Sequence, residues 1–194
     1  MKTGSIHPRW LSSMENKKIP AKLYLCATPI GNLEDITLRC LRILRGAAAV
    51  YCEDTRNTLK LMNHFEIKKT LISCHEYNEE QRANEIAERV RGGEAIAFVS
   101  DAGMPGVSDP GSRLVRFFIE NDLPFEVLPG ANAVLTAWVM SGLPTESLYF
   151  CGFIPRSGAE RSEAVERIKN SEATVVLYES PHRVAATFAD FSES

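Results

Sequence analysis

The sequence predicts an α/β protein in which a mostly parallel sheet carries helices on both faces. Two observations lead to this fold class: short apolar runs alternate with helix-length amphipathic segments, and the alternation repeats five times in succession. Five consecutive strand–helix units favour parallel strands, because each helix returns the chain to the end of the sheet where the previous strand began. The expected strand and helix of each unit are 23–27 and 36–46, 48–52 and 55–65, 71–74 and 79–91, 95–100 and 111–121, and 125–128 and 133–141.

A second α/β lobe is expected after the loop that contains Pro129 and Gly130. Beyond Pro144 the alternation resumes with a strand at 148–151, a helix near 159–170, a strand at 174–178 and a helix from Pro181 onward. We therefore expect three parts: a basic, disordered leader over 1–22, an N-terminal lobe over 23–129, and the start of a second lobe over 130–194.

The composition indicates a soluble protein with a packed core. Of 194 residues, 44% are hydrophobic and 24% are charged, which excludes a disordered chain. The longest apolar runs, 95–99 and 174–178, are far shorter than the roughly 20 residues of a membrane helix. The leader lacks the apolar segment of a secretory signal. We expect a cytoplasmic protein without a membrane anchor, whose five cysteines are reduced and, lacking zinc-ligand spacing, hold no metal.

The charge distribution argues against a strongly basic nucleic-acid-binding surface. The formal net charge is −3, and residues 1–22 alone carry +4, so the remainder of the chain carries −7. An acidic body weighs mildly against an RNA partner.

Polar residues crowd the segments that follow the expected strands. Parallel sheets bind ligands beyond the carboxyl ends of their strands, so these loops are the place to look for a site. Neither a P-loop nor a dinucleotide fingerprint follows the first strand, which argues against ATP hydrolysis and NAD chemistry. The loops in question are 28–32, 53–56, 75–79, 100–111 and 129–133.

The loop at 100–111 is acidic, and its glycines and prolines favour a rigid loop that a ligand can approach closely. Such a loop suits a cationic or hydroxyl-bearing ligand. For Asp109, as for Asp54 and Asp35, helix capping is the favoured interpretation. Asp101 lies well before the next helix, so we expect it to contact a ligand.

Histidines and arginines in three other loops admit two interpretations each. His75 with Glu76 and Glu79 could form a partial metal site or a base, or His75 could be an ordinary hydrogen-bonded loop residue. Ser180 is expected to cap the helix that Pro181 opens, which would put His182 and Arg183 in its first turn, against the helix dipole. The arginines of 153–161 could contact phosphate or simply face solvent.

Seven strings together resemble the tetrapyrrole-methylase-like family, and more narrowly a branch of it that acts on RNA. They run in order from Leu23 to Phe191 without large gaps, and several are long enough to be specific. The strings are LYLCATPIGNLEDITLR, CEDTRNT, SCHEYNE, FVSDAGMPGVSDPG, LPGANA, GFIPRSGAER and YESPHR.

The resemblance implies a methyltransferase that uses S-adenosylmethionine, forms a homodimer and binds the donor between two α/β lobes. The implied reaction is 2′-O-methylation of a cytidine ribose in the decoding region of small-subunit ribosomal RNA, with the RNA or the assembled subunit as partner. Members of the family are longer than this chain, so the second lobe is expected to be truncated. The residues implied to line the donor pocket are Pro29, Ile30, Gly31, Asp101, Ala102, Gly103, Met104, Gly130, Ala131, Asn132 and Ala133.

The fifth loop departs from the family pattern, because relatives often have Pro-Gly-Pro-Ser where this chain has Pro129-Gly130-Ala131-Asn132. A polar side chain is retained, but its contact with the donor is placed in doubt.

A ribose hydroxyl is a weak nucleophile at neutral pH, so a nearby base or orienting group is expected. The candidate catalytic residues are Glu53, Asp54, Arg56, His75, Glu76 and Glu179, and the candidate RNA-binding residues are Arg156, Arg161 and Arg183. Two other functions stay open: a small-molecule, tetrapyrrole-type methyltransferase of the same fold, and an inactive fragment that only binds the donor.

Overall fold

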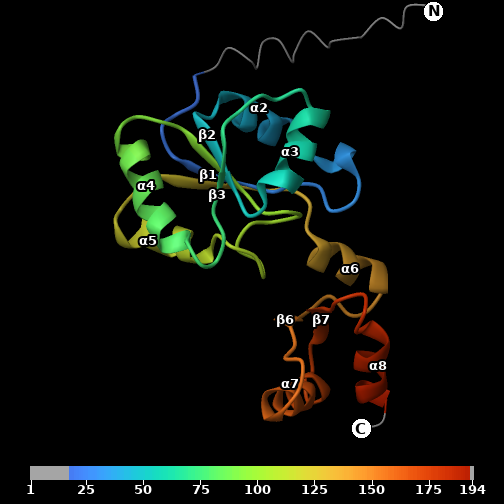
Figure 1. Ribbon diagram of the computed structural model, residues 1–194. Coiled ribbons are helices and arrows are strands. Elements are labelled where there is room, and N and C mark those ends of the chain that lie inside the picture. Colours follow the sequence, from blue (N-terminus) through green and yellow to red (C-terminus); the bar gives the residue numbers. More distant parts are fainter. Residues whose placement is uncertain (1–17, 193–194) are drawn as a thin grey trace, which may run out of the picture. The chain divides into compact units, whose positions relative to one another are not determined.

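The computed structural model describes residues 18–192, so most of the expected leader lies outside the described part. The chain divides into two compact units, one ending at Ala131 and the other beginning at Asn132 (Figure 1). The division falls in the same loop as the boundary expected from the sequence. Each unit has its own sheet.

The first unit is built on a five-stranded parallel sheet, which confirms the predicted fold class. The strand order is β3-β2-β4-β1-β5. The central strand β4 pairs with β1 and β2, while β3 and β5 form the edges. The strands are β1 (Leu23–Cys26), β2 (Ala49–Cys52), β3 (Leu71–Ser73), β4 (Ile96–Val99) and β5 (Phe125–Leu128).

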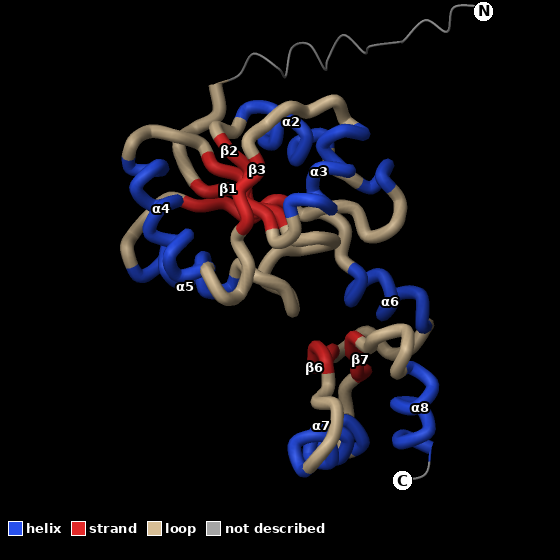
Figure 2. The backbone as a smooth tube through the Cα atoms, viewed as in Figure 1, coloured by secondary structure: helices blue, strands red, loops and turns tan. Residues whose placement is uncertain are grey.

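Helices cover both faces of this sheet (Figure 2). Alternate strand residues point to opposite faces, so Tyr24 and Val50 pack in the cluster that contains residues of α2 and α3, whereas Tyr51 and Phe98 pack with α4 and α5. Burial on both faces explains why these strands read as continuous apolar runs. The helices are α2 (Leu38–Gly46), α3 (Thr55–His64), α4 (Glu79–Arg91) and α5 (Ser112–Glu120), and a short 3-10 helix, η1, spans Leu33–Asp35.

Two of the three predicted helix caps are wrong. Asp54 does cap α3, because its carboxylate accepts a hydrogen bond from the Arg56 N–H at 2.8 Å. Asp35 lies inside η1, and Thr37 caps α2 instead. Asp109 does not cap α5, which starts at Ser112.

The N-terminus of α5 is capped from another helix. The Glu79 carboxylate of α4 is only 2% exposed and accepts hydrogen bonds from the N–H groups of Gly111 and Leu114, at 3.0 and 2.9 Å. A carboxylate suits this end of a helix, where backbone N–H groups lack partners. Glu79 therefore ties the two helices of this face together.

The second unit contains a two-stranded parallel sheet and three helices. Its strands are β6 (Leu148–Phe153) and β7 (Thr174–Tyr178), and its helices are α6 (Ala133–Ser141), α7 (Ala159–Lys169) and α8 (Val184–Ser192). The expectation that Pro181 opens α8 is wrong: residues 181–183 form a turn, and the backbone carbonyl of Ser180 accepts from the N–H groups of Arg183 and Val184. His182 and Arg183 thus precede the helix.

All five cysteines are unpaired, and four of them are buried. Within residues 18–192, no helix is long and apolar enough to cross a membrane.

Candidate functional site at the carboxyl edge of the first sheet

Three loops that the sequence linked to the methyl donor come together in the first unit. Thr28, after β1, and Gly103, after β4, form a two-way backbone bridge with N···O distances of 2.9 and 3.0 Å. A Cβ atom on Gly103 would lie 3.3 Å from Ile30 Cγ2 and 3.9 Å from the Ala131 carbonyl oxygen. Residues from the loops after β1, β4 and β5 are therefore neighbours, although the first and the last of these loops lie far apart in the sequence.

Glycines make this approach possible. Gly103 has a φ of +82°, which residues with a side chain rarely adopt. Gly130 passes so close to β1 that a Cβ atom there would lie 2.7 Å from the Ala27 Cβ. Gly31 has a φ of +146° with open space around it, so its backbone is accessible.

Asn132, where the family pattern is broken, has a local structural role. Its side-chain oxygen accepts a hydrogen bond from the Leu135 N–H at 3.0 Å and caps α6. Asparagine and serine both serve as helix N-caps, so either residue can fill this role at position 132.

Asp101 connects the loop after β4 to the start of α3. One carboxylate oxygen accepts from the Asp54 N–H at 3.2 Å, and the other accepts from the Asn57 side-chain amide at 2.8 Å. Asp101 is nevertheless exposed, and a carboxylate has about four acceptor positions, so two contacts leave capacity for a ligand. The ligand contact expected for Asp101 stays a prediction.

Asp54 and Arg56 form an ion pair at the beginning of α3, with 2.6 Å between Arg56 Nη2 and Asp54 Oδ2. Hydrogen bonds from the Arg56 guanidinium and backbone lower the pKa of Asp54 to about 2. A carboxylate held so firmly as an anion is a weak proton acceptor near neutral pH.

The pKa values of Glu53 and Asp109 are shifted in the opposite direction to that of Asp54. Burial and the nearby Asp101 carboxylate raise the pKa of both carboxyl groups, and the polar surroundings of each, the Asp101 backbone for Glu53 and the Ser100 side chain for Asp109, offset this only in part. Of the candidate bases in this unit, Glu53 is the carboxyl group whose pKa moves toward neutrality.

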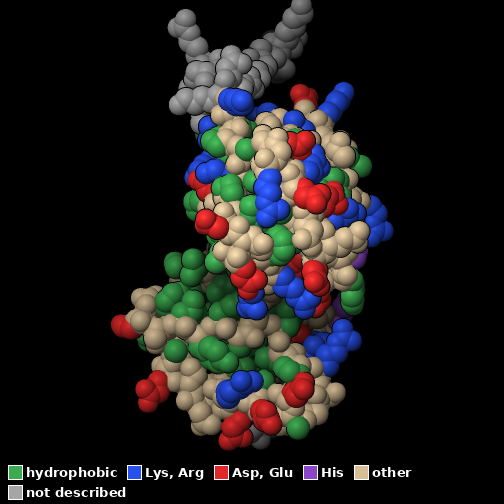
Figure 3. All heavy atoms as spheres, turned by 90° about the vertical axis from the view of Figure 1, so that its left-hand side faces the viewer, with side chains coloured by type: hydrophobic (Ala, Val, Ile, Leu, Met, Phe, Trp, Pro, Cys, Tyr) green, Lys and Arg blue, Asp and Glu red, His purple; other side chains and the backbone are tan. Residues whose placement is uncertain are grey.

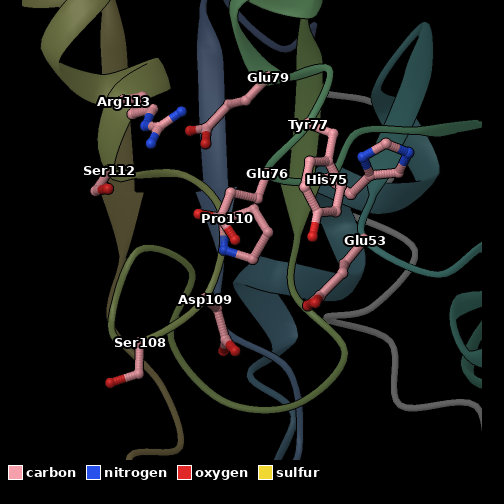
Figure 4. A pocket seen from close by; sticks show the side chains of 10 residues that line it. All are labelled: Glu53, His75, Glu76, Tyr77, Glu79, Ser108, Asp109, Pro110, Ser112 and Arg113. Atoms are coloured by element: carbon pink, nitrogen blue, oxygen red, sulfur yellow. The ribbon is translucent and has the colours of Figure 1, made fainter. Parts of the chain in front are cut away.

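Three hollows adjoin along this edge of the sheet. The first, about 290 Å³, is lined by Thr28, Pro29 and Asp101, among others. The second, about 400 Å³, shares Asp101 with the first and contains Glu53, Asp54 and Arg56. The third, about 530 Å³, shares Glu53 with the second and lies between the β3–α4 turn and the start of α5 (Figure 4). Asp101 and Glu53 thus lie where neighbouring hollows adjoin.

His75 and Glu76 both line the third hollow, as does Tyr77, which the sequence did not single out. Tyr77 lies between His75 and Asn78 in the SCHEYNE string, and only its exposure in the fold marks it. The backbone N–H of His75 donates to the Asn78 side chain at 2.8 Å, which fixes the turn. Among residues 18–192, no group of His, Cys, Asp and Glu is arranged to hold a metal ion.

The remaining candidates lie in the second unit, where most of them are held by internal contacts. The Glu179 carboxylate accepts from the Thr187 hydroxyl and the Ser180 N–H, both at 2.7 Å, and pairs with Arg183 at 3.3 Å. These hydrogen bonds lower the pKa of Glu179. A carboxylate with three internal partners and a side chain only 7% exposed serves the structure of this unit better than it serves proton transfer.

Two of the three candidate RNA-binding arginines are engaged within the chain. Arg161 pairs with Asp190 at 2.5 Å and also donates to the Pro155 carbonyl, and Arg183 reaches the same carbonyl at 3.4 Å. Arg156 is exposed, and it forms no hydrogen bond or ion pair with the residues that the structure describes. Contact of these arginines with RNA stays a prediction.

The chain matches the family model of tetrapyrrole (corrin/porphyrin) methylases over residues 22–194. Proteins named ribosomal RNA small subunit methyltransferase I are similar to it in sequence. The protein from Halalkalibacterium halodurans is 48% identical over 178 residues, which are 92% of this chain and 62% of the relative. The protein from Thermotoga maritima is 41% identical over 89% of this chain and 77% of the relative. The chain thus spans about three fifths of the length of the first of these curated relatives.

Solved structures share the fold. A cobalt precorrin-4 methyltransferase has a TM-score of 0.66 at 18% identity, covering 97% of this chain and 78% of that one. Uroporphyrin-III C-methyltransferase from Thermus thermophilus, in complex with S-adenosyl homocysteine, has a TM-score of 0.60 at 20% identity, covering 89% and 76%. Together with the convergence of the three loops, these matches show that the chain belongs to the tetrapyrrole methylase family, within the group of ribosomal RNA small subunit methyltransferase I.

Proposed function

We propose that this protein transfers a methyl group from S-adenosylmethionine to the 2′-oxygen of a cytidine ribose in the decoding region of small-subunit ribosomal RNA. The observation that carries the proposal is the meeting of the loops after β1, β4 and β5 at the carboxyl edge of a parallel sheet. The kinship with ribosomal RNA small subunit methyltransferase I supplies the substrate class.

The residues at this edge fit a donor of that chemistry. S-adenosylmethionine supplies an activated methyl group on a sulfonium, and it carries an ammonium as a second cation. Asp101 offers an exposed carboxylate, and Gly31 and Gly103 offer backbone that a ligand can approach closely. A phosphate-binding loop is absent from this edge, and this donor needs none. We assign Pro29–Gly31, Asp101–Met104 and Gly130–Ala133 to donor binding.

Glu53 is our choice for the base that accepts the ribose proton. It lies between the hollow beside Asp101 and the hollow beside His75, and its pKa is raised by burial and by its acidic neighbours. Asp54 and Glu179 have lowered pKa values and several hydrogen-bond partners, so we assign them to positioning and structure.

The Glu53 assignment is testable by substitution. We expect Glu53→Gln to reduce the rate of methyl transfer by about a hundredfold, in line with the loss of a general base. Glu80→Gln, an exposed carboxylate of α4 that lines none of the three hollows, is the matched control. An unchanged rate in Glu53→Gln would rule Glu53 out as the base.

The acidic edge weighs against the small-molecule alternative. Asp101 lies close enough to Glu53 and Asp109 to raise the pKa of both, and a tetrapyrrole that carries several carboxylates would meet like charges there. RNA phosphates would also be repelled, but a ribose and a base can enter while the phosphates stay outside, near the exposed guanidinium of Arg56.

The direct experiment measures transfer of a radiolabelled methyl group. Small ribosomal subunits that lack the modification are offered beside uroporphyrinogen, with S-adenosylmethionine as donor. We expect label on the RNA and none on the tetrapyrrole, and mapping should place it on a ribose. Label on uroporphyrinogen alone would favour the small-molecule function.

An inactive donor-binding fragment is the non-enzyme alternative, because the chain spans only about three fifths of some relatives. Calorimetric titration with S-adenosylmethionine separates the two. Binding together with turnover supports the enzyme, whereas binding without turnover supports the fragment.

We also propose that the protein is a cytoplasmic homodimer, and that the second copy covers apolar side chains of the second unit. Val139 and Met140 of α6 are 73% and 82% exposed, and Phe153 and Phe188 are also exposed. Figure 3 shows apolar side chains gathered on this unit. Exposed apolar surface of this kind marks an interaction site.

Light scattering should give twice the chain mass, and Val139→Asp should give the monomer. A wild-type monomer would contradict the proposal.

A further inference from the structure

The third hollow has the shape of a binding pocket that the reaction assigned above does not explain. It holds about 530 Å³ and shares Glu53 with the second hollow, so it adjoins the proposed site of methyl transfer. In Figure 4, His75, Tyr77 and Glu53 lie along one wall, while Ser108, Ser112 and Arg113 lie along the other. Both walls come from elements of the first unit, so the pocket is complete within it.

Tyr77 is the most unusual residue of this pocket. Its side chain is 95% exposed, although a ring of this size normally buries most of its surface. The turn that carries it is well fixed: the His75 N–H donates to the Asn78 side chain, and the Asn78 N–H donates to the His75 carbonyl. The ring meets the His75 ring edge to face, with 5.9 Å between centroids. A rigid turn thus presents an aromatic face to solvent at the mouth of a pocket.

The charged groups of the pocket are mainly carboxylates, and Tyr77, Ser108 and Ser112 add hydroxyl groups that can donate or accept. Glu53, Glu76 and Asp109 contribute carboxyl groups, and Arg113 is the cation on the opposite wall. Burial and the nearby Asp101 carboxylate raise the pKa of Asp109, so further negative charge beside Asp109 is disfavoured. A phosphate would be repelled, whereas a neutral group that donates hydrogen bonds would be favoured.

An exposed aromatic face beside carboxyl acceptors matches one class of ligand well. Unpaired bases stack on aromatic side chains and offer their edges for hydrogen bonding. A carboxylate accepts a hydrogen bond from the exocyclic amino group of cytosine. Uracil has a carbonyl oxygen in that position, so a carboxylate there would place two acceptors against each other. The pocket therefore discriminates in favour of an amino-bearing base.

We infer that this pocket holds the unpaired cytosine of the RNA substrate, with Tyr77 as its stacking surface and Asp109 as an acceptor for its amino group. The inference rests on the proposed function, which supplies RNA as the substrate. It adds a specificity-determining role for the SCHEYNE and SDPG segments. With the base in this pocket, the ribose lies toward Glu53, at the junction with the second hollow.

Binding of short RNA tests the inference without any methyl transfer. The probes are fluorescein-labelled single-stranded pentanucleotides that differ only in a central cytidine or uridine, and the readout is fluorescence anisotropy with the whole chain. We expect the cytidine probe to bind about tenfold more tightly than the uridine probe, as befits one well-placed base contact. Equal affinity, or no measurable binding of either probe, overturns the inference.

Three variants identify the residues responsible. Tyr77→Ala should weaken binding of the cytidine probe about tenfold, because one base–aromatic stack is lost. Tyr77→Phe keeps the ring and should bind within about twofold of wild type. Asp109→Asn should bring the cytidine and uridine affinities close together, since an amide can donate to the uracil oxygen. Ile119→Ala, an exposed apolar residue of α5 outside the pocket, is the matched control.

The outcomes separate this inference from the proposed function. If the probes bind as expected but ribosomal subunits receive no methyl group, the pocket stands and the methyltransferase assignment falls. If subunits are methylated and Tyr77→Ala has the wild-type KM and probe affinity, the assignment stands and the pocket falls. Because the Tyr77 side chain is almost fully exposed, its variants should keep the wild-type melting temperature, which serves as the folding check.

Discussion

The two units are built from the same alternation of strands and helices, but they differ in how completely these elements are buried. In the first unit, β1, β2 and β4 are buried at every position, between α2 and α3 on one face and α4 and α5 on the other. In the second unit, every residue of β7 and most of β6 is only half-buried, and α6 buries Val134 alone. Alternating strands and helices therefore predict the elements but not how completely they cover one another.

The units also differ in what holds them together. Apolar packing dominates the first, whereas a chain of polar contacts connects the elements of the second. Arg161 of α7 bonds to Asp190 and Thr187 of α8, and Thr187 donates to Glu179 at the end of β7. Such networks fix geometry but add little net stability when they are partly exposed.

The largest expected effect on stability comes from comparing one phenylalanine of the first unit with one of the second. Phe118→Ala, in the fully buried core of the first unit, should lower the free energy of unfolding by about 4 kcal/mol. Phe188→Ala, on an exposed position of α8, should change it by less than about 1 kcal/mol in the monomer. Urea denaturation at low protein concentration measures both. Equal losses would contradict the contrast between the units.

Glu79 tests whether the first unit depends on one buried polar link. Glu79→Ala leaves the N–H groups of Gly111 and Leu114 without an acceptor, so we expect a loss of about 2 kcal/mol. Glu80→Ala, the exposed neighbour in the same turn, is the control and should be close to neutral. Thermal melts and urea curves provide the measurement. A Glu79 variant as stable as the control would show that α5 does not need this cap.

The polar network of the second unit should contribute less to the free energy of unfolding than the Glu79 hydrogen bonds of the first unit. Arg161→Ala removes contacts to Asp190, Thr187 and the Pro155 carbonyl, and we expect a loss of about 1 kcal/mol after allowance for solvent screening. Asp190→Asn, at the more exposed end, should cost less still. Urea curves with and without 0.5 M salt should show a smaller difference at high salt. A loss as large as that of Phe118→Ala would reverse the comparison.

The smallest effects on stability are expected from two aspartates of the first unit whose pKa values are shifted in opposite directions. The folded pKa of Asp54 is lowered to about 2, so its contribution is present above the unfolded pKa near 4 and is lost as pH falls toward 2. The folded pKa of Asp109 is raised, so its penalty is absent below about pH 4 and grows as pH rises through the folded value.

Asp54→Asn should therefore lower the urea midpoint at pH 7, and Asp109→Asn should raise it slightly. Both differences should shrink toward zero as the pH is lowered below 4 and approaches 2. Denaturation series at several pH values check the signs. Shifts of the same sign for the two variants at pH 7 would contradict the electrostatics of this edge.

Local signals explain which features could be predicted from the sequence. The bounds of α4, β5, α6 and β7 agree with the expected ranges, because each is delimited by turn or capping residues next to it. Asp54 was identified correctly as a cap, since its partner is two residues away. The cap of α5 could not be found in this way, because Glu79 and Gly111 are separated by 32 positions and meet only when α4 and α5 pack together.

The same distinction between local and long-range signals applies to the residues of the candidate site. The sequence by itself determined the fold class and the order of the loops, and its family resemblance led to the segments that we propose for donor binding. Only the tertiary structure decided which charged residues remain available: it engages Glu179, Arg161 and Asp54 in internal contacts, and it leaves Tyr77 exposed. The physical reason is that secondary structure follows from neighbours in the chain, whereas burial, hydrogen-bond partners and pKa depend on residues that come together only in the folded molecule.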